Sequence, residues 1–144
     1  MIQRIQTVYF FLAALFSATG FILPVYRIIT PPEFITELTL NNTEALGFPV
    51  LIAYIVAVVL PLVALMLYKN RPLQVRVGRV AILATLAGLA LLVIKYGNTS
   101  KEAGVQVFAS IGMFIPIGSI VFLILAIRAV KKDEALVRSA DRIR

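Results

Sequence analysis

Residues 48–68 read FPVLIAYIVAVVLPLVALMLY, an apolar stretch that no Asp, Glu, Lys or Arg interrupts. At a rise of about 1.5 Å per residue, a helix of this length spans the roughly 30 Å hydrocarbon core of a bilayer. The whole chain shares this character, because 60% of its 144 residues are hydrophobic and 15% are charged, whereas soluble domains have roughly 45–50% and 25%. The sequence therefore predicts an integral membrane protein of the all-α class.

Three further apolar segments complete a predicted bundle of four transmembrane helices, at residues 7–26, 77–96 and 105–127. The second of these is the shortest, because only residues 80–94 are uncharged, and Arg79 and Lys95 are expected to snorkel to the two interfaces. The first segment also fits a signal peptide, but its apolar run to residue 26 is longer than an ordinary signal core. We expect one bundle over residues 1–130 and a separate basic tail over residues 131–144.

The distribution of Lys and Arg predicts the orientation, because these residues resist translocation. Only three of the 14 basic residues, Arg27, Lys95 and Lys101, fall on one side of the predicted bundle. The other side holds the remaining eleven: Arg4, Lys69, Arg71, Arg76, Arg79, Arg128, Lys131, Lys132, Arg138, Arg142 and Arg144. Both termini and the loop 69–79 are therefore expected in the cytoplasm.

The two loops on the opposite, outer side differ in length. In the first, residues 35–40 alternate between apolar and polar side chains after Pro31 and Pro32, which predicts a short strand or β-hairpin on the membrane surface. The second outer loop, residues 97–104, is expected to be only a polar turn.

Small side chains favour close packing between helices in a membrane. In the third segment Ala81, Ala84, Thr85 and Gly88 recur at i, i+3, i+4 and i+7. The complete predicted packing set is Ala14, Ala18, Ala81, Ala84, Thr85, Gly88, Gly112 and Ser119. Such faces favour packing within the chain's own bundle, and an interface with a partner membrane protein is the alternative.

The composition restricts the chemistry that this chain can perform. It contains no His and no Cys, which excludes thiolate nucleophiles, His-based triads and the usual zinc ligands. The predicted spans carry no carboxylate to bind a proton, as a proton-coupled transporter would be expected to have. The outer acidic residues are too scattered to propose a lipid-modifying site. We therefore expect no enzymatic activity, no metal and no cofactor.

Two prolines, Pro61 and Pro116, lie near the middle of their predicted helices and should kink them. Broken helices line substrate sites in transporters, and the nearby polar side chains are Tyr54, Ser110 and Ser119. Structural kinks are one interpretation of these prolines. A small transporter or an oligomeric pore is the other.

The predicted cytoplasmic surface carries a basic loop and a basic tail. Leu136, Ala140 and Ile143 recur at i, i+4 and i+7, which predicts an amphipathic helix continuing the fourth segment. The tail fits a helix lying on anionic headgroups and also a helix docked onto a partner complex, whereas nucleic acid is disfavoured because the tail has no aromatic residue. The candidate contact residues are Lys69, Arg71, Arg76, Arg79, Lys131, Lys132, Arg138 and Arg142.

Three elements carry a resemblance to a known family: residues 1–7 (MIQRIQT), residues 69–76 (KNRPLQVR) and residues 131–144 (KKDEALVRSADRIR). They resemble the domain-of-unknown-function 4293 family, small four-helix inner-membrane proteins of Bacteroidota. The resemblance covers essentially the whole chain and implies a bacterial inner membrane. It implies no catalytic residues.

The sequence thus favours a multi-pass inner-membrane protein that is an accessory or scaffolding subunit of a membrane protein complex. Its expected partners are anionic lipid headgroups and a membrane protein or further copies of the chain. The alternative is a small transporter or oligomeric pore built on the two proline-containing helices.

Overall fold

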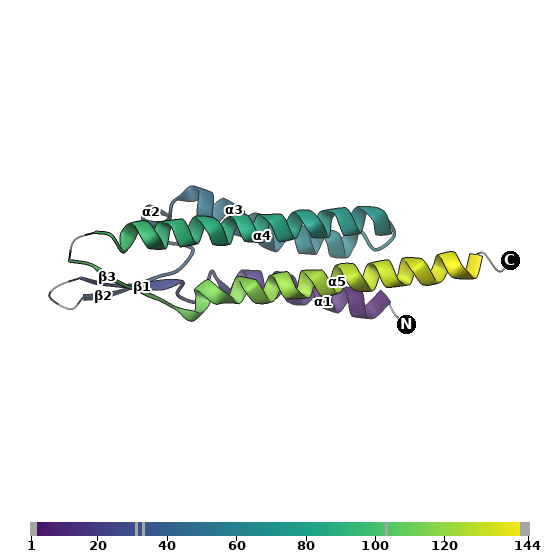
Figure 1. Ribbon diagram of the computed structural model, residues 1–144, viewed down its shortest axis with the longest axis horizontal. Helices are drawn as coiled ribbons and strands as arrows, with labels where there is room; N and C mark the ends of the chain where they lie inside the picture. Colours follow the sequence, from purple (N-terminus) through teal and green to yellow (C-terminus); the bar gives the residue numbers. More distant parts are fainter. Residues whose placement is uncertain (1–2, 31, 33, 103, 142–144) are drawn as a thin grey trace.

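The computed structural model describes residues 3–30, 32, 34–102 and 104–141 of the chain. These residues form five helices and three strands (Figure 1). In chain order the elements are α1 (Gln3–Thr19), β1 (Tyr26–Thr30), β2 (Phe34–Leu38), α2 (Thr43–Leu46), α3 (Phe48–Met66), α4 (Arg71–Thr99), β3 (Gln106–Ala109) and α5 (Ile111–Asp141).

The four longer helices pack side by side into an elongated bundle, and the small sheet lies beyond one end of it (Figure 1). α1 contacts α3 and α5, and α4 contacts the same two helices, so each helix has two neighbours in a closed ring. Both chain termini lie at the opposite end from the sheet (Figure 1). We call these two ends the termini end and the sheet end.

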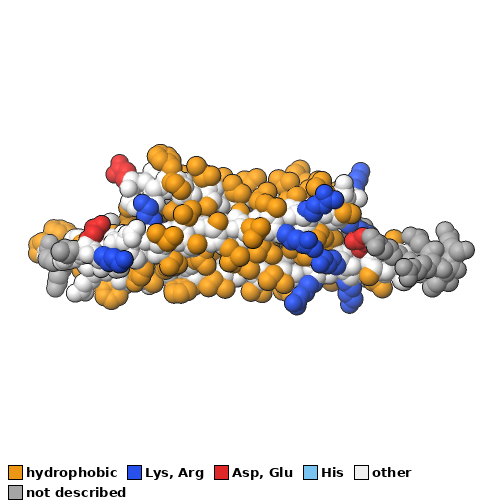
Figure 2. Space-filling view, turned by 45° about the horizontal axis from the view of Figure 1, so that its top comes forward, with side chains coloured by type: hydrophobic (Ala, Val, Ile, Leu, Met, Phe, Trp, Pro, Cys, Tyr) orange, Lys and Arg blue, Asp and Glu red, His pale blue; other side chains and the backbone are white. Residues whose placement is uncertain are grey.

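Three of the described helices are long and apolar enough to cross a membrane: Phe48–Met66, Arg71–Thr99 and residues Ile111–Val137 of α5. A shorter apolar helix, Ile5–Thr19, packs beside them. Only 28% of the most apolar window in α3 and in α4 is buried within the protein. Hydrophobic side chains cover the middle of the visible surface (Figure 2). Such a surface is consistent with the apolar interior of a bilayer.

The first predicted helix, residues 7–26, is wrong at its far end because α1 stops at Thr19. Gly20 lies tightly against Leu40, where an added Cβ would be 2.8 Å from the leucine Cδ1. Pro24, which has no backbone N–H to donate, precedes β1. The apolar residues that follow α1 therefore pack at the sheet end instead of extending the helix.

The β-hairpin predicted for the first outer loop is present, with Pro32 in the turn between β1 and β2. Tyr26 pairs with Leu38 and Thr30 with Phe34 in an antiparallel register. The hairpin gains a third strand that the sequence did not predict, because β3 pairs with the free edge of β1 and gives the order β2-β1-β3. Residues 105–109 therefore do not begin the last helix as expected, and α5 starts at Ile111.

The last two helices are longer than predicted at the termini end. α4 begins at Arg71 instead of residue 77, because the Asn70 side chain accepts a hydrogen bond from the Leu73 N–H at 3.3 Å and Pro72 occupies the first turn. α5 continues without a break to Asp141, so the described part of the basic tail extends the helix, as the sequence predicts. Much of the predicted basic loop 69–79 is consequently helical.

Two buried apolar clusters hold these elements together. One lies toward the termini end and includes Phe10, Ala81, Leu123 and Val130. The other joins the helices to the sheet, where Tyr26 and Leu38 pack with Tyr54 and Leu92. The sheet is thus anchored to the bundle through a continuous apolar core.

Candidate functional surfaces

The termini end carries most of the exposed positive charge. Lys and Arg side chains gather on this part of the visible face (Figure 2). Arg71 is half-buried, whereas Lys69, Arg76, Arg79, Arg128, Lys131 and Lys132 are exposed. The side chain of Arg138 and the whole of Arg142 lie outside the described residues. Six of the eight predicted contact residues are therefore placed, and all six belong to this end.

Three polar side chains are buried beneath this charged surface, Gln6 in α1, Gln74 in α4 and Asp133 in α5. Their exposures are 6%, 2% and 6%. The contact of Gln6 and Arg71 with Asp133 is called the buried polar cluster. The Gln6 amide Nε2 donates to the Asp133 carboxylate Oδ2 and also lies 3.4 Å from the carbonyl oxygen of Ala129. Sequence reasoning placed Asp133 in a solvated tail, and the burial corrects that prediction.

Arg71 attaches α4 to the same region of α5. Its Nη1 donates to the backbone carbonyl oxygen of Asp133 at 3.4 Å. Asp133 Oδ1 and Gln74 Oε1 have no hydrogen-bond partner within the described part of the chain. Buried acceptors without a donor each cost about 1–3 kcal/mol. The contacts of Gln6 and Arg71 with Asp133 join α1 and α4 to α5 at one point.

The sequence contains a signal for the burial of Asp133. Leu123, Ala126, Val130 and Asp133 follow one another at spacings of three, four and three residues, which places them on one helix face. The first three are fully buried in the bundle. A carboxylate in register with an apolar stripe indicates a buried acid, even where two lysines precede it in the sequence.

The residues predicted to pack helices are mostly inside the bundle. Ala14, Ala81, Thr85, Gly88, Gly112 and Ser119 are buried, whereas Ala18 and Ala84 are partly buried. Gly88 fits closely against a neighbouring helix, because an added Cβ would lie 3.1 Å from the Tyr54 ring. Two small residues outside the predicted set make similar contacts: Gly78 against Ile127 and Gly118 against Phe16.

The polar groups near the predicted kinks are also engaged in helix packing. The Ser119 hydroxyl, one turn after Pro116, donates to the carbonyl oxygen of Ala13 at 2.8 Å and lies 2.8 Å from the Ser17 hydroxyl. Ser119 donates its one hydroxyl proton to the Ala13 carbonyl oxygen. The Ser17 hydroxyl therefore donates to the Ser119 hydroxyl oxygen. These hydrogen bonds hold α1 against α5. Tyr54 is 1% exposed and packs on Gly88.

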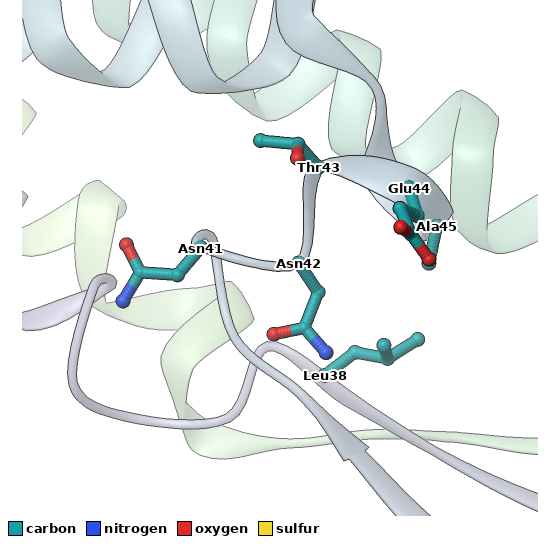
Figure 3. A pocket seen from close by; sticks show the side chains of 6 residues that line it. All are labelled: Leu38, Asn41, Asn42, Thr43, Glu44 and Ala45. Carbon is teal, nitrogen blue, oxygen red and sulfur yellow. The ribbon is translucent and has the colours of Figure 1, made fainter.

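At the sheet end a cavity of about 470 Å³ opens between the hairpin and α2. It is lined by Leu38, Asn41, Asn42, Thr43, Glu44 and Ala45 (Figure 3). The Asn41 amide donates to the Phe21 carbonyl oxygen at 3.0 Å, and the Thr39 hydroxyl donates to the Asn42 side-chain oxygen at 3.1 Å. Both asparagines thus hold the turn that connects the sheet to α2.

The Tyr26 hydroxyl is an ionisable group at the sheet end whose pKa is shifted. Burial raises the pKa of the Tyr26 hydroxyl above its ordinary value of 10.0, and the Glu102 carboxylate raises it further. The nearby Thr99 side chain offsets part of the rise in pKa, although the hydroxyl has no hydrogen bond of normal geometry within the described residues. The ring packs edge-on against Tyr96 with centroids 5.9 Å apart. Tyr26 therefore acts as a neutral anchor between sheet and bundle.

The described residues contain no group of three or more acidic, His or Cys side chains arranged to hold a metal ion. A protein-family model described as Domain of unknown function (DUF4293) matches residues 2–143. The chain belongs to this family. No curated protein and no solved structure matches the chain. Membership in DUF4293 assigns no activity, so the function must be inferred from the surfaces described above.

Proposed function

We propose that this DUF4293 protein is a non-enzymatic accessory or scaffolding subunit of a membrane protein complex in a bacterial inner membrane. The observation that carries the proposal is the basic surface of the termini end. Its exposed side chains Lys69, Arg76, Arg79, Arg128, Lys131 and Lys132 lie at one end of a bundle in which Gln6, Ser17 and Ser119 are used in contacts between helices. Positive charge is retained on the cytoplasmic side of membranes, so this surface is assigned to the cytoplasm.

The proposal assigns different tasks to different parts of the chain. The bundle anchors the protein in the bilayer. The basic surface binds anionic headgroups and the cytoplasmic part of the complex. Each Lys or Arg close to an anionic membrane contributes about 1 kcal/mol to headgroup binding. The sheet, which Tyr26 and Leu38 attach to the bundle, lies on the outer side of the membrane.

The direct test is purification of the tagged protein in mild detergent, with the co-purifying proteins measured against it. We expect a defined partner at a stoichiometric ratio. Replacing Arg76, Arg79, Lys131 and Lys132 with Gln should lower recovery of the partner and leave the helices folded by circular dichroism. Arg71 is kept, because it holds Asp133. A matched control, Lys101→Gln near the sheet, should not change recovery.

The same purification tests the alternative of a transporter or pore, which the buried prolines Pro61 and Pro116 inside α3 and α5 favour. Recovery of the protein alone, or as a homo-oligomer, would contradict the accessory role. Solute flux through vesicles reconstituted with the purified protein would then be the deciding measurement.

A further inference from the structure

The inference concerns the last part of α5, residues 131–141, which we call the α5 extension. α5 is 31 residues long, or about 46 Å at 1.5 Å per residue. The hydrocarbon core accommodates only about 20 of these residues. α5 extends past the beginning of α1 at the termini end (Figure 1). The α5 extension is therefore expected to project beyond the bilayer.

The buried polar cluster fixes the direction of the α5 extension. Gln6 binds Asp133 from α1, and Arg71 binds it from α4, so α5 is held on two sides at its exit from the bundle. No Pro or Gly occurs between Ser119 and Asp141, and sharp bends in helices usually need one of them. The α5 extension therefore continues along the bundle axis and does not turn back to lie on the headgroups.

The α5 extension exposes an unusual combination of side chains for a helix in water. Leu136 and Val137 are 49% and 47% exposed, and Lys131 and Lys132 are exposed one turn before them. The one acid of this turn that faces the bundle, Asp133, is buried. Glu134, which lies between the lysines and the apolar pair in sequence, is partly buried, and the described side chains exposed on this segment therefore include an apolar pair and two lysines.

Resting on the proposed function, we infer that the α5 extension docks onto an acidic protein surface in the cytoplasm. Leu136 and Val137 fill an apolar contact there, and Lys131 and Lys132 pair with carboxylates around it. Charge complementarity selects an acidic partner, and the direction of the helix carries the apolar pair away from lipid. Without an aromatic side chain in this segment, nucleic acid lacks a stacking platform.

The first experiment measures the surroundings of residue 136. A nitroxide label is attached to Leu136→Cys in nanodiscs that contain phosphatidylglycerol; the chain has no native Cys to interfere. Collisions with a water-soluble relaxation agent should dominate at this position. Leu83→Cys, on an exposed apolar position of α4, is the control and should collide mainly with oxygen dissolved in lipid. A label at residue 136 that behaves like the one at residue 83 would overturn the inference.

The second experiment identifies the occupant in native membranes. A photoreactive amino acid at position 136 should form an adduct with a protein that carries acidic residues at the cross-linked site. Lys131→Glu with Lys132→Glu should lower the adduct yield about tenfold, the loss expected when roughly 1.4 kcal/mol of pairing is removed. Changing the partner's contacting acids to Lys should restore the yield.

Three outcomes contradict the inference: a lipid adduct, a nucleic-acid adduct, or a protein adduct that the charge reversal does not reduce. A partner that co-purifies but never cross-links at residue 136 would overturn this docking site and leave the accessory role intact. Absence of any co-purifying protein would overturn both.

Discussion

The hydroxyl oxygens of Ser17 and Ser119 lie 2.8 Å apart in the buried contact between α1 and α5. Neither side chain is exposed to solvent, at 1% and 0%. Polar contacts of this kind hold membrane helices together, because lipid offers apolar helix faces no hydrophobic driving force to associate. The hydroxyl pair therefore fixes how the shorter helix α1 sits against α5.

Replacing either serine should weaken this contact, and Ser119→Ala should cost more because Ser119 also donates to the Ala13 carbonyl oxygen. We expect Ser17→Ala and Ser119→Ala each to lower the free energy of unfolding by about 0.5–2 kcal/mol, with a coupling energy of about 0.6 kcal/mol in the double-mutant cycle. Unfolding in sodium dodecyl sulfate, followed by circular dichroism, measures both quantities. Fully additive losses would show that the two hydroxyls do not interact.

The junction of α5 with α1 predicts a contrast between two polar substitutions. Gln6→Leu removes the donor to the Asp133 carboxylate and leaves a buried acceptor unpaired, at a cost of about 1–3 kcal/mol. Asp133→Asn keeps an oxygen to accept from Gln6 and should be nearly neutral. The same unfolding measurement compares them, and an equal loss in both variants would argue against the hydrogen bond.

Replacing Gly112 should destabilise the protein, because α5 begins directly against the residues that lead into β1. An added Cβ would lie 2.5 Å from the carbonyl oxygen of Pro24, a backbone atom that cannot move aside. We expect Gly112→Ala to destabilise the protein by about 1–3 kcal/mol. Gly97→Ala is the control, because nothing lies within 4 Å of the added Cβ. Thermal unfolding of the two variants should separate them clearly.

The raised pKa of the Tyr26 hydroxyl predicts that the protein loses stability at alkaline pH. Its pKa is higher in the folded protein than the ordinary value of 10.0, so folding favours the neutral phenol. The stabilisation is complete below about pH 10 and disappears as the pH rises through the folded-state pKa. Tyr26→Phe should remove this dependence. Unfolding midpoints between about pH 8 and 11 test this, and parallel curves for both proteins would contradict it.

Part of this fold could be read from the sequence because single helices in a membrane are encoded locally. Residues 48–68 were predicted and α3 spans Phe48–Met66, since an uncharged apolar run leaves little choice in a bilayer. The hairpin was also predicted, from Pro31 and Pro32 followed by alternating residues. The sequence places Arg76, Arg79, Lys131 and Lys132 on one side, and the described structure gathers them at one end.

The missed features depend on contacts between distant segments. β3 forms only because residues 106–109 meet the free edge of β1, some 80 residues earlier in the chain. α1 ends at Thr19 because the apolar residues after it pack at the sheet end, which no local pattern shows. Asp133 is buried because Gln6 lies opposite it, 127 residues away.

The central claim is a membrane-embedded bundle with its basic termini end in the cytoplasm and its sheet outside. Single cysteines at two exposed positions test it in intact bacterial cells: Glu44→Cys at the sheet end and Ser139→Cys in the α5 extension. The account predicts that a membrane-impermeant maleimide labels residue 44 directly, and residue 139 only after the inner membrane is permeabilised. Labelling of residue 139 alone in intact cells would contradict it.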